Sequence, residues 1–301
     1  MGFIMGVNEN TLDIFYGTPF QHVPPFRTQL LKWIGNKQRF AHEIASFFPK
    51  DIKTYFEPFL GSGAVLATLQ PPKALGSDAF GPLSEIWKTL ANKPEKLIQW
   101  YSERYLEYFE FEKPKGYEII KARYNSRPNG ADLLFLCRSC YGGVVRFRKS
   151  DGYMSTPCGA HTPIAPESFA KRVQIWRRRT AGAEFAGLDF SEAMQMAGYG
   201  DLVYCDPPYT HSQAILYQGQ NFELARLMRE IAHCKERGVR VALSIDGRKK
   251  SGRVKCPLDI PNGLFEREVF VNCGRSMLRR FQRGGESLED DVVHDRLLLT
   301  Y

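Results

Sequence analysis

The sequence predicts an α/β protein whose doubly wound sheet carries helices on both faces and one inserted module. Three observations lead to this prediction. Short runs of β-forming residues alternate with helical spacing, a glycine turn joins the first strand to a helix, and residues 91–165 break the alternation. With 301 residues, 43% of them hydrophobic, the chain can build one large core and a subordinate module.

The strands and helices follow from local patterns, taken in chain order. Residues 1–28 contain three prolines and little periodicity, so we expect an irregular leader there. Runs rich in β-formers predict strands at residues 54–59, 73–78, 183–190, 201–206, 240–245, 268–273 and 296–301. Helical spacing predicts helices within residues 30–48 and at 64–69, 83–100, 171–179 and 221–237. We therefore expect a main domain of residues 1–90 and 166–301.

The insertion, residues 91–165, has a pattern of its own. Acidic, aromatic helical segments come first, followed by two β-prone runs at residues 144–148 and 153–156. The turn between these runs contains Asp151-Gly152, which favours a β-hairpin. We expect a module of helices and one hairpin.

The charge of the chain favours a polyanionic partner. Lys and Arg total 41 against 33 acidic residues, which gives a net charge of +8 and a pI near 9.1. The basic residues gather at 138–149, 171–179 and 248–283, as in a binding footprint. Solvated helix faces are the alternative explanation of these clusters.

The cysteines and the hydropathy pattern argue against three classes of protein. Seven cysteines is an odd number, and Cys137-x-x-Cys140 has no second such pair, so neither a disulfide framework nor a zinc site is predicted. No secretory leader is recognisable, and no apolar run approaches the roughly 18 residues of a membrane span. We expect a cytoplasmic protein with free thiols, no metal and no membrane contact.

The run Asp206-Pro207-Pro208-Tyr209 follows a predicted buried strand, at the sheet edge where α/β proteins bind ligands. Two consecutive prolines fix φ and remove two N–H donors, so the loop is stiff and its carbonyl groups are free to accept hydrogen bonds. The tetrapeptide alone also fits an ordinary turn with a buried tyrosine. Its position after the strand favours a site.

Such a loop suits chemistry on an adenine amino group. The lone pair of that amine is delocalised into the ring, and two acceptors, the Asp206 carboxylate and the Pro207 carbonyl, favour a more reactive nitrogen. A base inside a duplex has to be flipped out to reach the loop, where Tyr209 can stack on its face. We predict Asp206, Pro207, Pro208 and Tyr209 as catalytic residues.

A second motif, Glu57-Pro58-Phe59-Leu60-Gly61-Ser62-Gly63, joins a predicted strand to a helix. Its glycines let the backbone approach a ligand, but the spacing is not that of a dinucleotide site and no Walker lysine follows. Asp78 ends the next strand, where a carboxylate can accept hydrogen bonds from both ribose hydroxyls. Asp78 alone also fits a helix cap. The pair of features favours an adenosyl ligand.

These motifs, in this order, resemble the Dam-type adenine-specific DNA methyltransferases, a class also called D12. The resemblance extends from Leu30 to Tyr301. It is carried by the runs Leu31–Lys37, Glu57–Gly63, Ser77-Asp78, Asp189-Phe190, Tyr204–Tyr209 and Arg296–Tyr301. It implies a Rossmann-like, S-adenosylmethionine-dependent methyltransferase fold with a helical and β-hairpin target-recognition insertion.

The resemblance also implies a cofactor site for S-adenosylmethionine, without a catalytic metal. Trp33 and Lys37 would lie at its methionine end, Asp78 would bind the ribose, and Asp189 with Phe190 would flank the adenine. The full predicted cofactor set is Trp33, Lys37, Glu57, Pro58, Phe59, Gly61, Gly63, Asp78, Asp189, Phe190 and Asp206. From the residues alone, Trp33 and Lys37 also fit an amphipathic helix start with a core indole and a solvated ammonium.

Double-stranded DNA is the implied partner, and residues 91–165 are the implied target-recognition module. The usual asparagines of the family are missing from the hairpin, so base-specific roles cannot be assigned. The predicted DNA-binding residues are Arg138, Arg146, Arg148, Lys149, Arg279 and Arg280. Charges on an exposed hairpin also serve to resist aggregation, and this alternative stays open.

We predict a prokaryotic or phage-encoded enzyme of restriction-modification or DNA marking, which methylates adenine N6 in duplex DNA. A cognate restriction endonuclease, acting separately, is a partner that the resemblance leaves open. Two rival functions remain: an RNA or protein amine methyltransferase, and a DNA-binding regulator that has lost catalysis. The basic hairpin argues against the first, and the intact Gly61, Gly63, Asp78 and Asp206 argue against the second.

Overall fold

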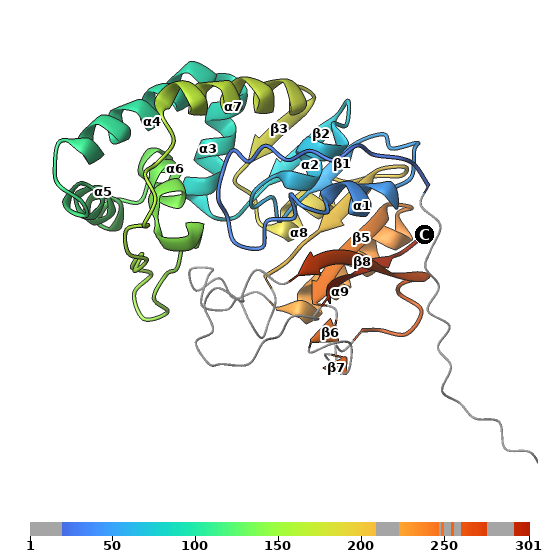
Figure 1. Ribbon diagram of the computed structural model, residues 1–301. Coiled ribbons are helices and arrows are strands. Elements are labelled where there is room, and N and C mark those ends of the chain that lie inside the picture. The colour runs from blue at the N-terminus through green and yellow to red at the C-terminus, as the bar shows by residue number, and fades with distance from the viewer. Residues whose placement is uncertain (1–19, 209–222, 247, 250–253, 256–259, 276–291) are drawn as a thin grey trace, which may run out of the picture.

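A mixed sheet forms the centre of the molecule, as the computed structural model shows (Figure 1). The structure describes residues 20–208, 223–246, 248–249, 254–255, 260–275 and 292–301. The strands of the sheet are β1 (Tyr55–Glu57), β2 (Ala74–Ser77), β3 (Ala183–Ala186), β4 (Leu202–Cys205), β5 (Arg240–Asp246), β8 (Arg267–Arg275) and β9 (Val292–Leu299). Each of the predicted strands is therefore confirmed, with shifted ends.

The strand order is β3-β2-β1-β4-β5-β9-β8. The first five strands are mutually parallel, whereas β9 runs antiparallel to both β5 and β8. The chain starts in the middle of the sheet at β1, builds outward to β3, and returns through β4 to the other side. The carboxyl ends of β1, β2 and β4 consequently lie at one edge, next to the point where the strand order reverses.

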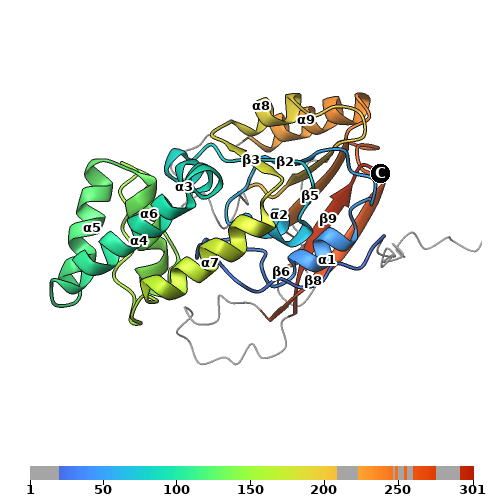
Figure 2. The ribbon, with the colours of Figure 1, turned by 90° about the horizontal axis from the view of Figure 1, so that it is seen from above.

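Helices cover both faces of the sheet (Figure 2). On one face lie α1 (Ala41–Ser46), α2 (Ala64–Leu69) and α7 (Pro166–Arg179), and on the other lie α8 (Phe190–Gln195) and α9 (Leu224–Glu236). Successive strand residues point to opposite faces of the sheet. Tyr204 accordingly packs in the larger hydrophobic cluster, and its neighbours Val203 and Cys205 pack in the smaller one. The predicted layered fold is confirmed.

The inserted segment is helical and packs beside the sheet. Helix α3 (Gly81–Asn92) leads into it. The helices of the segment itself are α4 (Pro94–Phe109), α5 (Lys115–Ser126), α6 (Gly130–Ser139) and the short 3₁₀ turn η1 (Tyr141–Gly143). Helical spacing predicts one helix over residues 83–100, but Pro94 begins a second helix because proline is favoured in a first turn and disrupts an interior. Buried Leu133 and Phe135 belong to the same hydrophobic cluster as Tyr204, so this segment shares the core of the sheet.

The predicted hairpin pairs as expected. Phe147 and Met154 form an antiparallel bridge, the amide of Arg148 donates to the carbonyl of Tyr153 at 2.9 Å, and Gly152 has a φ of 67°. A second bridge joins Cys140 to Cys158 below it. The Asp-Gly signal therefore locates the turn correctly.

Two further features differ from the sequence-based expectation. The strand predicted to reach Phe190 ends at Ala186, because the Asp189 side chain accepts from the amide of Ser191 and starts α8 with a capping box to Glu192. A short ribbon of β6 (Arg248–Lys249) and β7 (Val254–Lys255) was not predicted.

Among the described residues, no helix is both long and apolar enough to cross a bilayer, and no cluster of metal-ligating side chains occurs. Five cysteines of the described part of the chain have a described environment. All five are free thiols, and four of them are buried.

Candidate active site

A segment before α1, residues 26–37, runs past the sheet edge and is here named the strap. Three side chains of α6 and α7 bind its backbone carbonyl groups. Trp176 donates to Thr28 at 2.9 Å, Arg172 to Gln29 at 3.0 Å, and Arg138 to Leu30 at 2.7 Å. The strap is thereby fixed to the helices just before it delivers Trp33 and Lys37.

The position of Arg138 corrects the expectation that it contacts DNA. Its side chain is buried, its guanidinium lies 5.8 Å from the ring centre of Phe169, and its Nη1 donates to the strap carbonyls of Gln29 and Leu30. Arg179 of the same predicted basic footprint donates to the carbonyl of Ala67 and lies over the Phe26 ring at 4.1 Å. These charges are used inside the fold, because their guanidinium groups satisfy carbonyls that would otherwise be buried without a donor.

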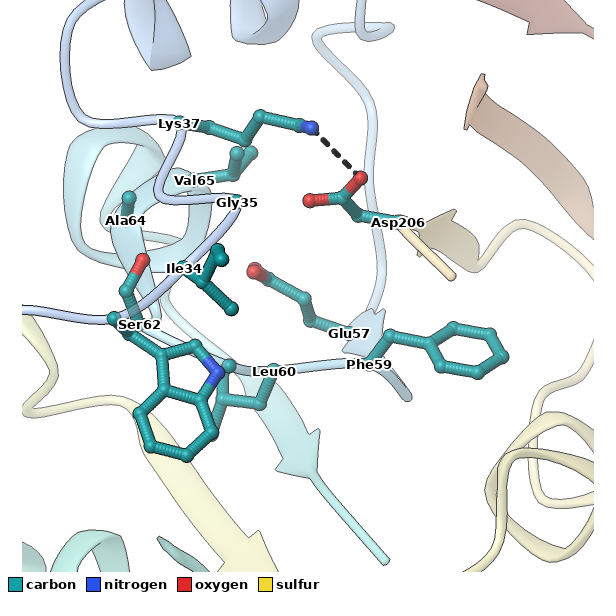
Figure 3. A pocket seen from close by; sticks show the side chains of 12 residues that line it. Ile34, Gly35, Lys37, Glu57, Phe59, Leu60, Ser62, Ala64, Val65 and Asp206 are labelled. Atoms are coloured by element: carbon teal, nitrogen blue, oxygen red, sulfur yellow. Dashed lines mark ion pairs between the residues drawn. The ribbon is translucent and has the colours of Figure 1, made fainter. Parts of the chain in front are cut away.

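A pocket that is partly open to solvent lies where the strap, the β1–α2 turn and the end of β4 meet (Figure 3). Its lining residues are Trp33, Ile34, Gly35, Lys37, Glu57, Phe59, Leu60, Gly61, Ser62, Ala64, Val65 and Asp206. Both sequence motifs thus contribute to one pocket.

An ion-pair cluster occupies the β4 side of the pocket. The Lys37 Nζ is 2.9 Å from Asp206 Oδ1 and 3.2 Å from Asp295 Oδ2 (the first contact is drawn in Figure 3). Burial would lower the pKa of Lys37, but the two carboxylates outweigh it, so the pKa lies above its usual value and the ammonium stays charged. Sequence reasoning missed Asp295, which is an acidic residue within an apolar strand run.

Glu57 points into the same space from the end of β1 (Figure 3). Its side chain is only 2% exposed, and the Tyr55 hydroxyl donates to Glu57 Oε2 at 2.8 Å. Burial, and then the nearby Asp206, raise the pKa of Glu57 to about 8, although the Tyr55 hydrogen bond acts in the opposite direction. Glu57 is therefore mainly protonated at neutral pH.

The β1–α2 turn brings backbone close to the pocket. Gly61 and Gly63 have φ values of 48° and 62°, and a Cβ on Gly63 would lie 3.1 Å from the Trp87 ring. The amides of Gly61 and Phe80 each donate to the Asp78 carboxylate at 3.0 Å. Burial raises the pKa of Asp78 to about 6 despite these hydrogen bonds. Asp78 is thus joined directly to the glycine turn.

Trp33 provides a hydrogen-bond donor toward the pocket. Its indole is 7% exposed and stacks on Phe80 with ring centres 6.1 Å apart. Its buried Nε1 has no hydrogen-bond partner among the described residues. A buried N–H without an acceptor is unfavourable, so this atom suits a ligand that carries an acceptor such as a carboxylate.

Asp189 and Phe190 lie beside the pocket rather than in its lining. Phe190 stacks on Phe59, with ring centres 5.2 Å apart, and Phe59 does line the pocket. Asp189 forms an ion pair with Arg226 at 2.5 Å, and the Arg226 guanidinium lies 4.7 Å from the Phe190 ring centre. Arg226, on the polar side of α9, had no recognisable signal in the sequence.

Comparison with known proteins identifies the family. The family model for D12 class N6 adenine-specific DNA methyltransferases matches residues 33–254. The chain belongs to this family. The match begins at Trp33, in the strap, and includes every residue that lines the pocket, whereas Asp295 lies beyond its end.

Named relatives point to the same group. The DNA N-6-adenine-methyltransferase of Escherichia phage P1 is 27% identical over 90% of this chain and 35% of its own length. The retron Ec67 DNA adenine methylase of Escherichia coli is 31% identical over 60% of this chain and 63% of its own length. The DNA adenine methylase of Vibrio cholerae is 25% identical over 71% and 79%. The chain thus spans about one third of the length of the phage P1 relative and somewhat less than two thirds of the length of the retron relative.

The hairpin of this D12 family member carries exposed basic residues. Arg146, Arg148 and Lys149 all face solvent, and Arg148 pairs with Asp151 at 2.7 Å while lying 4.2 Å from the Tyr153 ring centre. On the inner side, Phe147 packs edge-on against Phe80 with ring centres 5.5 Å apart. Since Phe80 also stacks on Trp33, the hairpin is fixed to the pocket wall.

Six other predicted residues are three prolines near the pocket and three residues of later segments. Pro58 and Pro207 are buried, and Pro208 is half-buried beside them in its loop. Tyr209, Arg279 and Arg280 lie outside the described residues, so their predicted roles stay predictions.

Proposed function

We propose that this chain is a site-specific DNA methyltransferase that transfers a methyl group from S-adenosylmethionine to the 6-amino group of adenine in duplex DNA. One observation carries the proposal: Asp206, with its ion-paired Lys37, and the glycine turn of residues 57–63 line the same pocket. A methyl donor and an amine held there would meet across a few ångströms.

The residues in the pocket and beside it fit the cofactor. S-adenosylmethionine supplies an electrophilic methyl group on a positively charged sulfur. The unpartnered Nε1 of Trp33 suits its carboxylate, and Glu57 offers an acceptor for its ammonium group. Asp78 keeps acceptor lone pairs for ribose hydroxyls, and the Phe59–Phe190 pair offers an apolar surface for the adenine ring.

Asp206 and Pro207 act on the amine. The carboxylate of Asp206 and the carbonyl of Pro207 accept its two N–H bonds and orient the nitrogen lone pair toward the methyl donor. Lys37 holds Asp206 through the 2.9 Å ion pair, which fixes the direction of that carboxylate. Pro208 stiffens the loop, and Tyr209 stacks on the flipped base.

Residues 91–165 recognise the target in this proposal. The exposed Arg146, Arg148 and Lys149 meet phosphates or base edges from the hairpin, and Arg279 and Arg280 are proposed as further DNA contacts. The protein would act in the cytoplasm of a prokaryote or on phage DNA, with any restriction endonuclease acting separately.

Expression in a host that lacks DNA methylation tests the proposal. Sequencing with modified-base detection should find N6-methyladenine in one short, fixed context. Methylcytosine, or no modified base, contradicts it. Labelled cofactor added to duplex DNA, single-stranded RNA and protein separates the rival methyltransferases, and calorimetry that finds no cofactor binding favours the inactive regulator.

A further inference from the structure

Phe80 lies at the N-cap of α3, behind the residues that line the pocket. Its backbone is fixed on both sides. Its amide donates to the Asp78 carboxylate at 3.0 Å, and its carbonyl accepts from the amides of Leu83 and Ser84 at 3.0 and 3.1 Å. Its ring is 8% exposed and belongs to the larger hydrophobic cluster. A ring on a backbone held in this way is a rigid support for its neighbours.

The Phe80 ring supports the Trp33 indole. The two rings stack with their centres 6.1 Å apart and an angle of 29° between their planes. The indole also lies against the glycine turn, where a Cβ on Gly61 would be 3.4 Å from the indole Cδ1. Phe80 and Gly61 therefore leave the indole little freedom to turn. They fix the direction of its Nε1, the buried donor that has no partner among the described residues.

The same ring meets the inner side of the hairpin, residues 144–156. Phe147 packs edge-on against Phe80, with ring centres 5.5 Å apart and 67° between the planes. Phe147 is 3% exposed, and it bridges to Met154 on the second arm of the hairpin. Aromatic pairs of this geometry stabilise a structure beyond the area that they bury. Phe80 thus contacts both a residue that lines the pocket and a residue that anchors the hairpin.

The direction of the Trp33 N–H matters for one end of the cofactor. In the proposed function, Trp33 Nε1 donates to the carboxylate of the ligand. A hydrogen bond weakens steeply as its donor angle departs from linearity, so a small rotation of the indole is enough to weaken this one. The adenosine end of the ligand lies at Asp78 and the Phe59–Phe190 pair in that proposal, and the rotation leaves those contacts in place.

We propose that Phe80 is a positioning residue of the cofactor pocket, which aligns Trp33 Nε1 with the carboxylate of the cofactor and is itself supported by Phe147 of the hairpin. The hairpin thereby supports recognition of the amino-acid end of the ligand, although none of residues 144–156 lines the pocket. This inference rests on the proposed function and deepens it.

The test compares two ligands that share the adenosine portion. S-adenosylhomocysteine carries the amino-acid end with its carboxylate, and 5′-methylthioadenosine lacks it. Calorimetry with the purified protein gives the ratio of the two affinities, and a change in the folded fraction alters both affinities equally. In Phe80→Ala, and in the milder Phe80→Leu, the preference for S-adenosylhomocysteine should fall about tenfold, because a hydrogen bond to a charged acceptor is lost. Affinity for 5′-methylthioadenosine should stay near wild type, because the backbone amide of residue 80 still donates to Asp78.

Phe147→Ala should lower the same preference about threefold, because it removes the ring that supports Phe80 from the hairpin. Phe47→Ala is the matched control. Phe47 is also 8% exposed, but it is the C-cap of α1, and its carbonyl accepts from the Tyr301 hydroxyl after the end of β9. This control loses a ring of the same burial away from the pocket, so it should keep the wild-type preference.

Three results overturn the inference: a wild-type preference in both Phe80 variants, an equal fall in Phe47→Ala, or a wild-type protein that binds the two ligands equally well. A wild-type preference in Phe147→Ala overturns the support by the hairpin. If the wild-type protein binds neither ligand, the proposed function is wrong and the inference falls with it. That outcome is distinguishable from a wild-type preference that the Phe80 variants retain.

Discussion

The charged residues around Lys37 and those on the hairpin meet their surroundings in opposite ways. Lys37 and Asp295 are buried, and the ammonium contacts two carboxylates at once. Arg146 and Arg148 face solvent on the hairpin. Buried charges are strongly coupled and fixed in place, whereas exposed charges are screened by salt. The first group is suited to chemistry at one atom, and the second to attraction of a polyanion.

Replacement of Lys37 should give the largest effect. Lys37→Met leaves the buried Asp295 carboxylate and the half-buried Asp206 carboxylate without their shared ammonium, which should cost about 3 to 5 kcal/mol of unfolding free energy. Chemical denaturation measures this loss. Lys53→Met, at an exposed lysine near the opposite sheet edge, should change little. Equal stability of the two variants would mean that the cluster contributes nothing to the fold.

Glu57 should make stability depend on pH in a defined window. The folded protein holds the Glu57 proton up to a pKa of about 8, compared with 4.5 for an ordinary glutamate. Stability contributed by this proton is complete below about pH 4.5 and is lost as the pH rises toward 8, by up to about 1.4 kcal/mol per unit. Glu57→Gln should flatten the unfolding free energy across this window.

The control for that experiment is Glu184→Gln, at an exposed glutamate of β3. It should follow the wild-type pH dependence. A wild-type slope that Glu57→Gln leaves unchanged contradicts the protonation assigned to Glu57.

Arg138 should behave as a structural residue in spite of its sequence neighbours. Arg138→Met removes donors from the carbonyls of Gln29 and Leu30 and should cost about 2 kcal/mol of unfolding free energy. Denaturation measures the loss, and a DNA titration at several salt concentrations should give the wild-type salt dependence. A reduced salt dependence of DNA affinity together with unchanged stability would mean that Arg138 contacts DNA and has no structural role.

The hairpin arginines should show the smallest effect on the fold and a clear effect on DNA affinity. In the double variant Arg146→Ala/Arg148→Ala, the slope of log affinity against log salt should fall by about 2, because two phosphate contacts are lost. Fluorescence anisotropy with labelled duplex measures the slope. Arg229→Ala, at an exposed position of α9 outside the predicted basic clusters, is the control and should leave the slope unchanged. Equal slopes in both variants contradict a DNA-binding hairpin.

The comparison also explains which predictions the sequence could support. The strands around Tyr55 and Tyr204, the glycine turn and the hairpin turn follow from local patterns, because adjacent residues determine them. Asp206 and Gly61 line one pocket because the carboxyl ends of parallel strands meet at the same edge of the sheet. These parts could be predicted because period and topology decide them.

Burial and long-range pairing could not be predicted in the same way. The contact of Lys37 with Asp295 joins positions at opposite ends of the sequence, and no local pattern encodes it. Arg138 and Arg146 are both arginines in one basic stretch, yet only tertiary packing buries the first. The protonation of Glu57 depends likewise on what surrounds it.

The central claim is that Asp206 acts on an adenine amine beside the cofactor pocket. Nucleoside analysis of duplex DNA, after incubation with purified protein and labelled S-adenosylmethionine, tests it most directly. The account predicts labelled N6-methyladenine with the wild-type protein and with Asp51→Ala, whose carboxylate is exposed at the opposite sheet edge. It predicts none with Asp206→Ala, although this variant should still bind the cofactor. Labelled cytosine, or full labelling of adenine by Asp206→Ala, would contradict it.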